Sequence, residues 1–237
     1  MRSPLQRPAS PQRFSHRLRL PRFGSPRARD RRACRVLATV AEVTGAPWSQ
    51  LAAWLASAIA SNEPRPRSFA LATADGEGRP HVRFVDHQPH LASYDEIGFV
   101  THFGSGKGRQ LAAVPFAAGT FFWPRLRRQL RVEGSVVLAS DTASDAYHRT
   151  RARESQLTAW ATRQSSPLAD RDQLERALEH QRGRWSDQKP LRPPHWGGYL
   201  LRPDRVEFWT AGPHRRHCRT LWERDPRGRW QSLQLQP

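Results

Sequence analysis

The spacing of apolar residues predicts that ordered structure begins near residue 47. In the stretch PWSQLAAWLASAIASN, large apolar side chains recur every three or four residues, at Trp48, Leu51, Leu55 and Ile59. This spacing places them on one face of an α-helix. Asn62 and Pro64 follow and are typical of a helix end.

Most of the apolar pattern further along the chain predicts β-strands. The runs are short and are separated by turn-forming residues, such as the DGEG between the first two. The predicted strands are Phe69–Thr73, His81–Val85, IGFVTHF, FAAGTFFW, RQLRVEGSVVL, GGYLLRP, RVEFWTA, RTLWERD and WQSLQL.

Three more helices are predicted. GSGKGRQLAAV opens a helix from a glycine-rich turn, SDTASDAYHRTRA starts at Ser140 with either Asp141 or Thr142 as its cap, and residues 169–185 form a charged amphipathic helix. Because the helices are grouped and do not alternate with the strands, the pattern predicts a mainly β, α+β fold built on an antiparallel barrel. It disfavours a parallel, doubly wound sheet.

The net charge of +18 is concentrated at the N-terminus, where residues 1–35 contain eleven arginines and a single acidic residue. A segment this polar and rich in proline cannot bury enough apolar surface to fold, so we expect residues 1–46 to be a disordered tail and residues 47–237 to be one domain. The tail could be a nucleic-acid-binding arm, an organellar presequence, or the product of a start codon assigned too early. Arginine outnumbers lysine throughout the chain, which favours a tail without a specific role. The tail has no aromatic residues besides Phe14 and Phe23, which argues against a nucleic-acid partner.

Membrane and metal functions are not supported by the sequence. No stretch approaches the roughly 20 apolar residues of a membrane-spanning helix, and no secretory signal opens the chain. The two cysteines, Cys34 and Cys218, have no metal-ligand spacing, and His214 and His217 beside Cys218 match no common zinc pattern. We therefore expect no metal, no membrane partner and a location in the reducing cytoplasm.

Two stretches carry residues suited to an anion. In GSGKGRQ, glycines let backbone N–H groups approach an anion, and Lys107 and Arg109 add charge at a helix N-terminus. By itself such a stretch is more often an ordinary turn. In AYHRTRARES, Tyr147, Arg151 and Ser155 are four residues apart, so on one helix they would line a single stripe and donate hydrogen bonds to a phosphate. Such a stripe is otherwise a solvated basic face.

A third candidate is the segment EFWTAGPHRRHCR. Arg215, His217 and Arg219 alternate with other residues, so in an extended chain they would share one side. They would then face either an anionic ligand or water.

Taken in order, several motifs resemble the pyridoxamine 5′-phosphate oxidase family of FMN-dependent split-barrel enzymes. They are LATADGEGRPHVR, THFGSGKGRQL, FFWPRLRRQLRVEG, AYHRTRARES, AWATRQSS, PPHWGGY, RVEFW and HRRHCR. The resemblance covers the chain from about residue 47 to Pro237, about four-fifths of its length. The resemblance implies an antiparallel split β-barrel and a homodimer that binds FMN across its interface.

The resemblance also implies roles for individual residues. The FMN site would comprise Arg83, Thr101, Lys107, Gln129, Gln164, Ser165, Trp209 and Arg219, with Arg83 and Lys107 near the phosphate end. Tyr147, Arg151 and Ser155 would hold the phosphate of a small substrate. Arg215 and His217 would lie over the substrate and act in catalysis. The implied reaction is oxidation of pyridoxamine or pyridoxine 5′-phosphate to pyridoxal 5′-phosphate, with O2 as acceptor and H2O2 as by-product.

Three positions depart from the family pattern. Gln88 stands where the family usually has a lysine, Gly106 where many members have an arginine, and Cys218 where an acid is usual. Similar departures occur in the phenazine-biosynthesis FMN oxidases of the same superfamily, so oxidation of a reduced phenazine precursor is the second hypothesis. A third, of another class, is a non-catalytic protein that binds flavin or pyridoxal phosphate.

Overall fold

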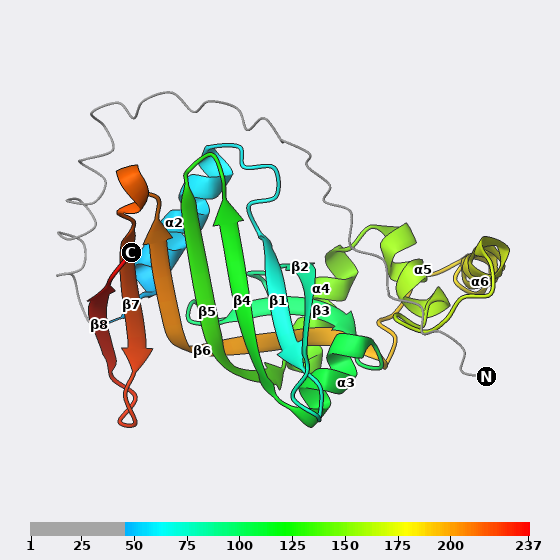
Figure 1. The fold of residues 1–237 in the computed structure, drawn as a ribbon. Helices are drawn as coiled ribbons and strands as arrows, with labels where there is room; N and C mark the ends of the chain where they lie inside the picture. The colour runs from blue at the N-terminus through cyan, green and yellow to red at the C-terminus, as the bar shows by residue number, and fades with distance from the viewer. Residues whose placement is uncertain (1–45) are drawn as a thin grey trace, which may run out of the picture.

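The structure of the protein, a computed structural model, describes residues 46–237 (Figure 1), so the prediction for the N-terminal tail lies outside the described residues. The strands of this part are β1 (Ser68–Ala74), β2 (Pro80–Asp86), β3 (Ile97–His102), β4 (Phe116–Trp123), β5 (Arg128–Leu138), β6 (Trp196–Thr210), β7 (Cys218–Arg224) and β8 (Trp230–Leu235). The helices are α2 (Trp48–Ala60), α3 (Gly106–Ala113), α4 (Asp141–Thr150), α5 (Arg153–Ala161) and α6 (Arg171–Arg184), with a 3-10 turn, η1, at Pro213–Arg215.

The sheet is antiparallel and splits at its longest strand. Its order is β2-β1-β4-β5-β6-β7-β8, and β3 also pairs with β6. One edge of β6 pairs with β5, whereas the other edge pairs with β3 over residues 196–201 and with β7 over residues 205–210. The antiparallel α+β barrel expected from the sequence is therefore confirmed, and β6 is the strand that both halves of the split share.

The sequence predicted two strands where the structure has the single strand β6. The pairing of β6 with β5 shifts register between Glu133 and Gly134, opposite Pro203. A Cβ on Gly134 would lie 2.1 Å from the carbonyl oxygen of Arg202, so only glycine allows this close approach. The irregularity absorbs the proline, which the sequence pattern had indicated as a break.

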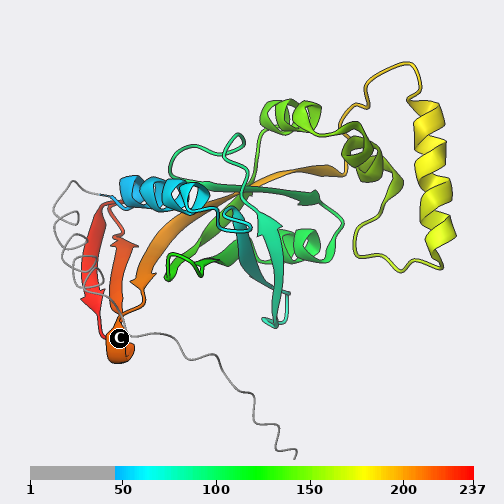
Figure 2. The ribbon, with the colours of Figure 1, turned by 90° about the horizontal axis from the view of Figure 1, so that it is seen from above.

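The core lies between the inner face of the sheet and α2, which covers the β6–β8 end (Figures 1 and 2). Trp54 of α2 makes edge-to-face contacts with Phe208 and Trp123, at centroid distances of 5.0 and 6.3 Å. Phe69 and Phe121 stack at 4.8 Å further along the same layer. Full burial of each such ring stabilises the fold by about 1.5–3 kcal/mol.

The predicted helix through Arg151 is wrong. Helix α4 begins after Ser140, whose hydroxyl accepts from the Ala143 amide at 3.1 Å, so neither Asp141 nor Thr142 is the cap. The chain leaves the helix at Arg151 (φ −71°, ψ 149°), and α5 begins two residues later. The Gln156 side-chain amide donates to the His148 carbonyl at 2.8 Å and so satisfies one of the carbonyls that the break exposes.

Helix α6 projects from the opposite end of the molecule from β8 (Figure 2) and buries none of its own residues fully. It is anchored by the adjacent Trp185, which packs against Trp160 of α5, and by Arg184, whose guanidinium lies over both rings. None of the helices in residues 46–237 has the length and hydropathy needed to cross a membrane.

Candidate functional site

A buried lysine marks the first group of candidate residues. Lys107 lies in the first turn of α3, and its Nζ donates to Thr101 Oγ1 (3.1 Å) and Gln164 Oε1 (3.2 Å). Burial, together with the charge of Arg83, lowers the pKa of Lys107 to about 8. Both partners are neutral, and no carboxylate of the described residues lies within ion-pair distance of Lys107.

Arg83 brings a second cation to the same region. It reaches from β2 to donate to Thr73 Oγ1 (2.6 Å) and Gln110 Oε1 (2.8 Å), and burial lowers its pKa. Ser105 caps α3 by accepting from the Gly108 amide at 3.2 Å, so the positive end of that helix adds to the field.

Ser165 lies beside this helix end, because a Cβ added to Gly106 would be 3.7 Å from its hydroxyl oxygen. We call Arg83, Thr101, Lys107, Gln164 and Ser165 the cationic pocket. Two cations, hydroxyl donors and a helix N-terminus, without a paired carboxylate, fit a phosphate such as that of FMN.

A second group surrounds Trp196. The Arg151 guanidinium lies over the Trp196 ring at 4.6 Å, and the Tyr147 ring lies parallel to it at 6.3 Å. Arg151 lines a pocket of about 440 Å³ together with Thr101 and Gln164, so it opens onto the cationic pocket. Its Nη1 is buried and has no hydrogen-bond partner among residues 46–237. Such a group normally has a partner, which a bound anion would supply.

The predicted site for the substrate phosphate, Tyr147, Arg151 and Ser155, is assembled differently from the expectation. Tyr147 and Arg151 meet at Trp196 although they do not share a helix stripe. Ser155 lies in the first turn of α5, half-buried, and in the described part of the chain it makes no hydrogen bond to either. Trp196 belongs to the PPHWGGY motif, but it was not among the predicted site residues.

The third group lies on three neighbouring strands. Gln129 of β5 is opposite Trp209 of β6, which is opposite Arg219 of β7. The His217 ring lies 4.7 Å from that of Trp209. The Gly212 amide donates to His217 Nδ1 at 3.2 Å, so the neutral imidazole carries its proton on Nε2 and offers that N–H as a donor.

Arg215 is not in an extended strand, contrary to the predicted alternation with His217 and Arg219. It ends the turn η1, where His214 has φ 52° and Arg215 has φ 63°, and β7 begins only at Cys218. Left-handed conformations at two successive non-glycine residues are costly and must be held by the surroundings. The Arg215 side chain is exposed.

One chain does not bring all of the candidate residues together. Helices α3 and α5, which carry Lys107 and Ser155 of the first two groups, lie toward one end of the molecule, whereas η1 and β7 lie at the other (Figures 1 and 2). Arg219 is also paired with Glu207, which the sequence pattern indicated only as a strand residue. Gln88 lines a separate hollow with Arg65 and Asp86.

Two family models match the chain and together cover most of the residues that the structure describes. Residues 55–184 match the family model "Pyridoxamine 5'-phosphate oxidase", and residues 196–237 match "Pyridoxine 5'-phosphate oxidase C-terminal dimerisation region". The chain is 45% identical to a pyridoxine/pyridoxamine 5′-phosphate oxidase of Pseudomonas fluorescens over 76% of its length and 83% of the relative. It is 47% identical to that of Anaeromyxobacter dehalogenans over 77% and 91%.

Solved structures give the same picture of the fold. PhzG from Burkholderia lata, in complex with tetrahydrophenazine-1-carboxylic acid, superposes with a TM-score of 0.77 at 31% identity, covering 83% of this chain and 95% of that one. A pyridoxamine 5′-phosphate oxidase-related, FMN-binding protein from Nostoc punctiforme superposes with a TM-score of 0.67 at 22% identity, covering 82% and 100%.

Proposed function

Because the chain belongs to the pyridoxamine 5′-phosphate oxidase family of FMN-dependent oxidoreductases, we propose that it oxidises pyridoxamine or pyridoxine 5′-phosphate to pyridoxal 5′-phosphate. FMN held in this site would supply the redox chemistry of the oxidation, with O2 as the final acceptor and H2O2 as by-product. With the amine substrate, water would also be consumed and ammonia released.

The observation that carries this proposal is the unpaired, buried Nη1 of Arg151 beside the cationic pocket. Two adjacent cationic centres suit two phosphates, one on FMN and one on the substrate. Arg83, Lys107, Thr101, Gln164 and Ser165 would hold the first. Tyr147, Arg151 and Ser155 would hold the second.

The remaining residues would orient the ring of the substrate. Arg215 and His217 would lie over it, with His217 donating from Nε2–H because Nδ1 already accepts from Gly212. This hydrogen bond makes His217 an anchor for the substrate more than a general base.

We propose that the complete site is formed by two copies of the chain. The C-terminal residues match a dimerisation region, and one chain separates the cationic pocket from Gln129, Trp209 and Arg219. In a symmetric homodimer, the cationic pocket of each chain would lie beside Gln129, Trp209 and Arg219 of the other chain. The dimer would therefore contain two equivalent sites.

A phenazine-type oxidase is the second candidate, because the PhzG structure superposes over most of the chain. Its ligand is a carboxylic acid, and a carboxylate could also pair with Arg151. The deciding experiment incubates the flavin-loaded protein in air with pyridoxine 5′-phosphate and, separately, with a reduced phenazine carboxylic acid, and measures H2O2. Turnover of the phosphate ester supports the proposal, whereas turnover of the phenazine alone, or bound flavin without turnover, contradicts it.

Replacing Arg151 by alanine is expected to raise the KM for pyridoxine 5′-phosphate by about 10- to 100-fold, because a charged hydrogen bond of about 1.5–3 kcal/mol is lost. FMN affinity is expected to stay close to that of the wild type. The matched control is Arg149→Ala, since Arg149 is an exposed arginine in the last turn of α4. Loss of FMN from Arg151→Ala would show that the two phosphate sites are assigned wrongly.

Two inactive variants, Lys107→Ala and His217→Ala, are expected to restore activity when their chains are mixed and allowed to exchange. Half of the dimers would then be mixed, and each would keep one intact site, so about a quarter of wild-type activity should return. Mixing Lys107→Ala with Arg83→Ala should restore nothing, because both changes lie in the same pocket. Equal recovery in both mixtures, or in neither, would rule out a site shared between chains.

A further inference from the structure

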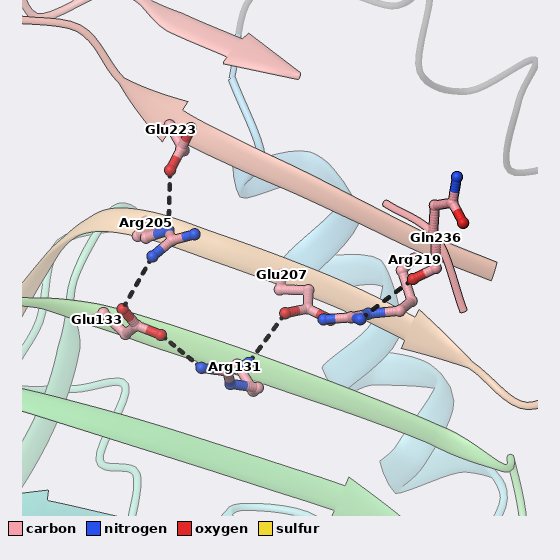
Figure 3. Close-up of polar contacts among 7 residues, drawn as sticks. All are labelled: Arg131, Glu133, Arg205, Glu207, Arg219, Glu223 and Gln236. Atoms are coloured by element: carbon pink, nitrogen blue, oxygen red, sulfur yellow. Dashed lines mark hydrogen bonds and ion pairs between the residues drawn. The ribbon is translucent and has the colours of Figure 1, made fainter. Parts of the chain in front are cut away.

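A line of alternating charges crosses three strands on the face of the sheet away from the core (Figure 3). We call it the charge ladder. Its members are Arg219, Glu207, Arg131, Glu133, Arg205 and Glu223. The ladder begins at the predicted flavin residue Arg219 and ends at Glu223, near the C-terminal end of the same strand β7.

Glu207 is the carboxylate that joins the ladder to Arg219. Its Oε1 accepts from Arg219 Nε at 2.7 Å, and its Oε2 accepts from Arg131 Nη1 at 3.1 Å. Each oxygen therefore serves a different arginine. Arg131 is paired with Glu133 as well, so the three arginines and three glutamates of the ladder carry no net charge together.

Burial distinguishes Glu207 from the other acids of the ladder. Its side chain is 7% exposed, compared with 25% for Glu133 and 47% for Glu223. Screening by water makes an exposed pair weak, whereas a buried carboxylate with both oxygens engaged holds its partners firmly. Its location between the core residues Val206 and Phe208 fixes the backbone that carries it.

Arg219 is held at a second point, because its Nη1 donates to the Gln236 carbonyl at 3.2 Å. With Nε and Nη1 engaged, the plane of the guanidinium is set, and Nη2 has no hydrogen-bond partner among residues 46–237. Trp209 is the register partner of Arg219 on β6. Without Glu207 the flexible arginine would sample several rotamers.

We propose that Glu207 is a positioning residue for the flavin: it orients Arg219 so that the free edge of the guanidinium presents a preorganised donor to FMN. Arg131 compensates the charge of the buried Glu207 carboxylate. It also binds the second oxygen of that carboxylate, so only one oxygen contacts Arg219. This inference rests on the proposed function and adds a residue that the flavin itself need not contact.

The test measures FMN affinity of the full-length apoprotein by quenching of flavin fluorescence. Glu207→Gln keeps the shape but loses the charge, and is expected to raise the FMN Kd about tenfold. The matched control, Glu223→Gln, changes the ladder at its exposed end and is expected to leave the Kd within about twofold. An unchanged Kd for Glu207→Gln would overturn the inference.

A double-mutant cycle separates positioning from a structural role. If Glu207 acts through Arg219, then Glu207→Gln combined with Arg219→Ala should bind FMN no more weakly than Arg219→Ala alone. Additive losses would mean that Glu207 acts elsewhere and would overturn the proposal. If Glu207→Gln does not fold, Glu207→Asp, which keeps the charge on a shorter side chain, takes its place with the same expectations. A wild-type protein that binds no FMN would instead refute the proposed function.

Discussion

Replacement of Gly212 by alanine is expected to lower kcat for pyridoxine 5′-phosphate by about 100-fold while FMN stays bound. A Cβ at this position would lie 1.7 Å from the Arg216 carbonyl oxygen and 2.6 Å from its carbon, far inside contact distance. The backbone must therefore move, and the Gly212 amide that holds His217 Nδ1 at 3.2 Å moves with it. Misplacement of a catalytic group by about 1 Å costs on the order of 100-fold in rate.

The effect should fall on turnover more than on FMN binding. The cationic pocket lies on other elements, and Trp209 and Arg219 are held by the pairing of β6 with β7. The measurement is kcat and KM at saturating FMN, together with the flavin content of the purified variant. Gly76→Ala is the matched control, since a Cβ there meets nothing within 4 Å. Wild-type kcat in Gly212→Ala would show that the turn η1 does not position Arg215 and His217.

Acidification from pH 7 to pH 4 is expected to destabilise the protein by several kcal/mol. Burial lowers the pKa of His87, His102 and His148 from 6.5 to about 4 each. Above pH 6.5 neither state binds these protons. As the pH falls below 6.5, the unfolded chain takes up protons that the folded chain cannot accept until about pH 4, so the free energy of unfolding decreases through this window. Each pKa unit corresponds to about 1.4 kcal/mol.

A substitution of His148 tests this explanation at one of the three buried histidines. It is 1% exposed, and neither ring nitrogen has a hydrogen-bond partner among the described residues. His148→Phe should therefore unfold at higher urea concentration than the wild type at pH 7, and should lose less stability between pH 7 and pH 5. The exposed His180 provides the control variant His180→Phe. If the free energy of unfolding depended on pH equally in His148→Phe and the wild type, His148 would not contribute to the destabilisation by acid.

Local sequence patterns were sufficient for most of the fold. Apolar spacing located α2 and the strands, and the glycine-rich turn located α3, because periodic burial is encoded in neighbouring residues. The ordered motifs indicated the family, which the comparisons confirm. Periodicity failed at Arg151 and Pro203. At Arg151 the helical pattern is overridden by the cation–π contact with Trp196 and by the hydrogen bond from Gln156. At Pro203 a β-bulge accommodates the proline within one continuous strand.

The sequence also supplied the candidate residues, but only the tertiary structure decided their arrangement. Tyr147 and Arg151 meet across a helix break, and Arg219 is held by a carboxylate twelve positions earlier in the chain. Contacts between strands depend on register and on which face each side chain occupies, and neither is contained in the spacing of one segment. For the same reason, the sequence did not indicate that the candidate residues lie at two ends of the molecule. The pairing of the strands determines that separation.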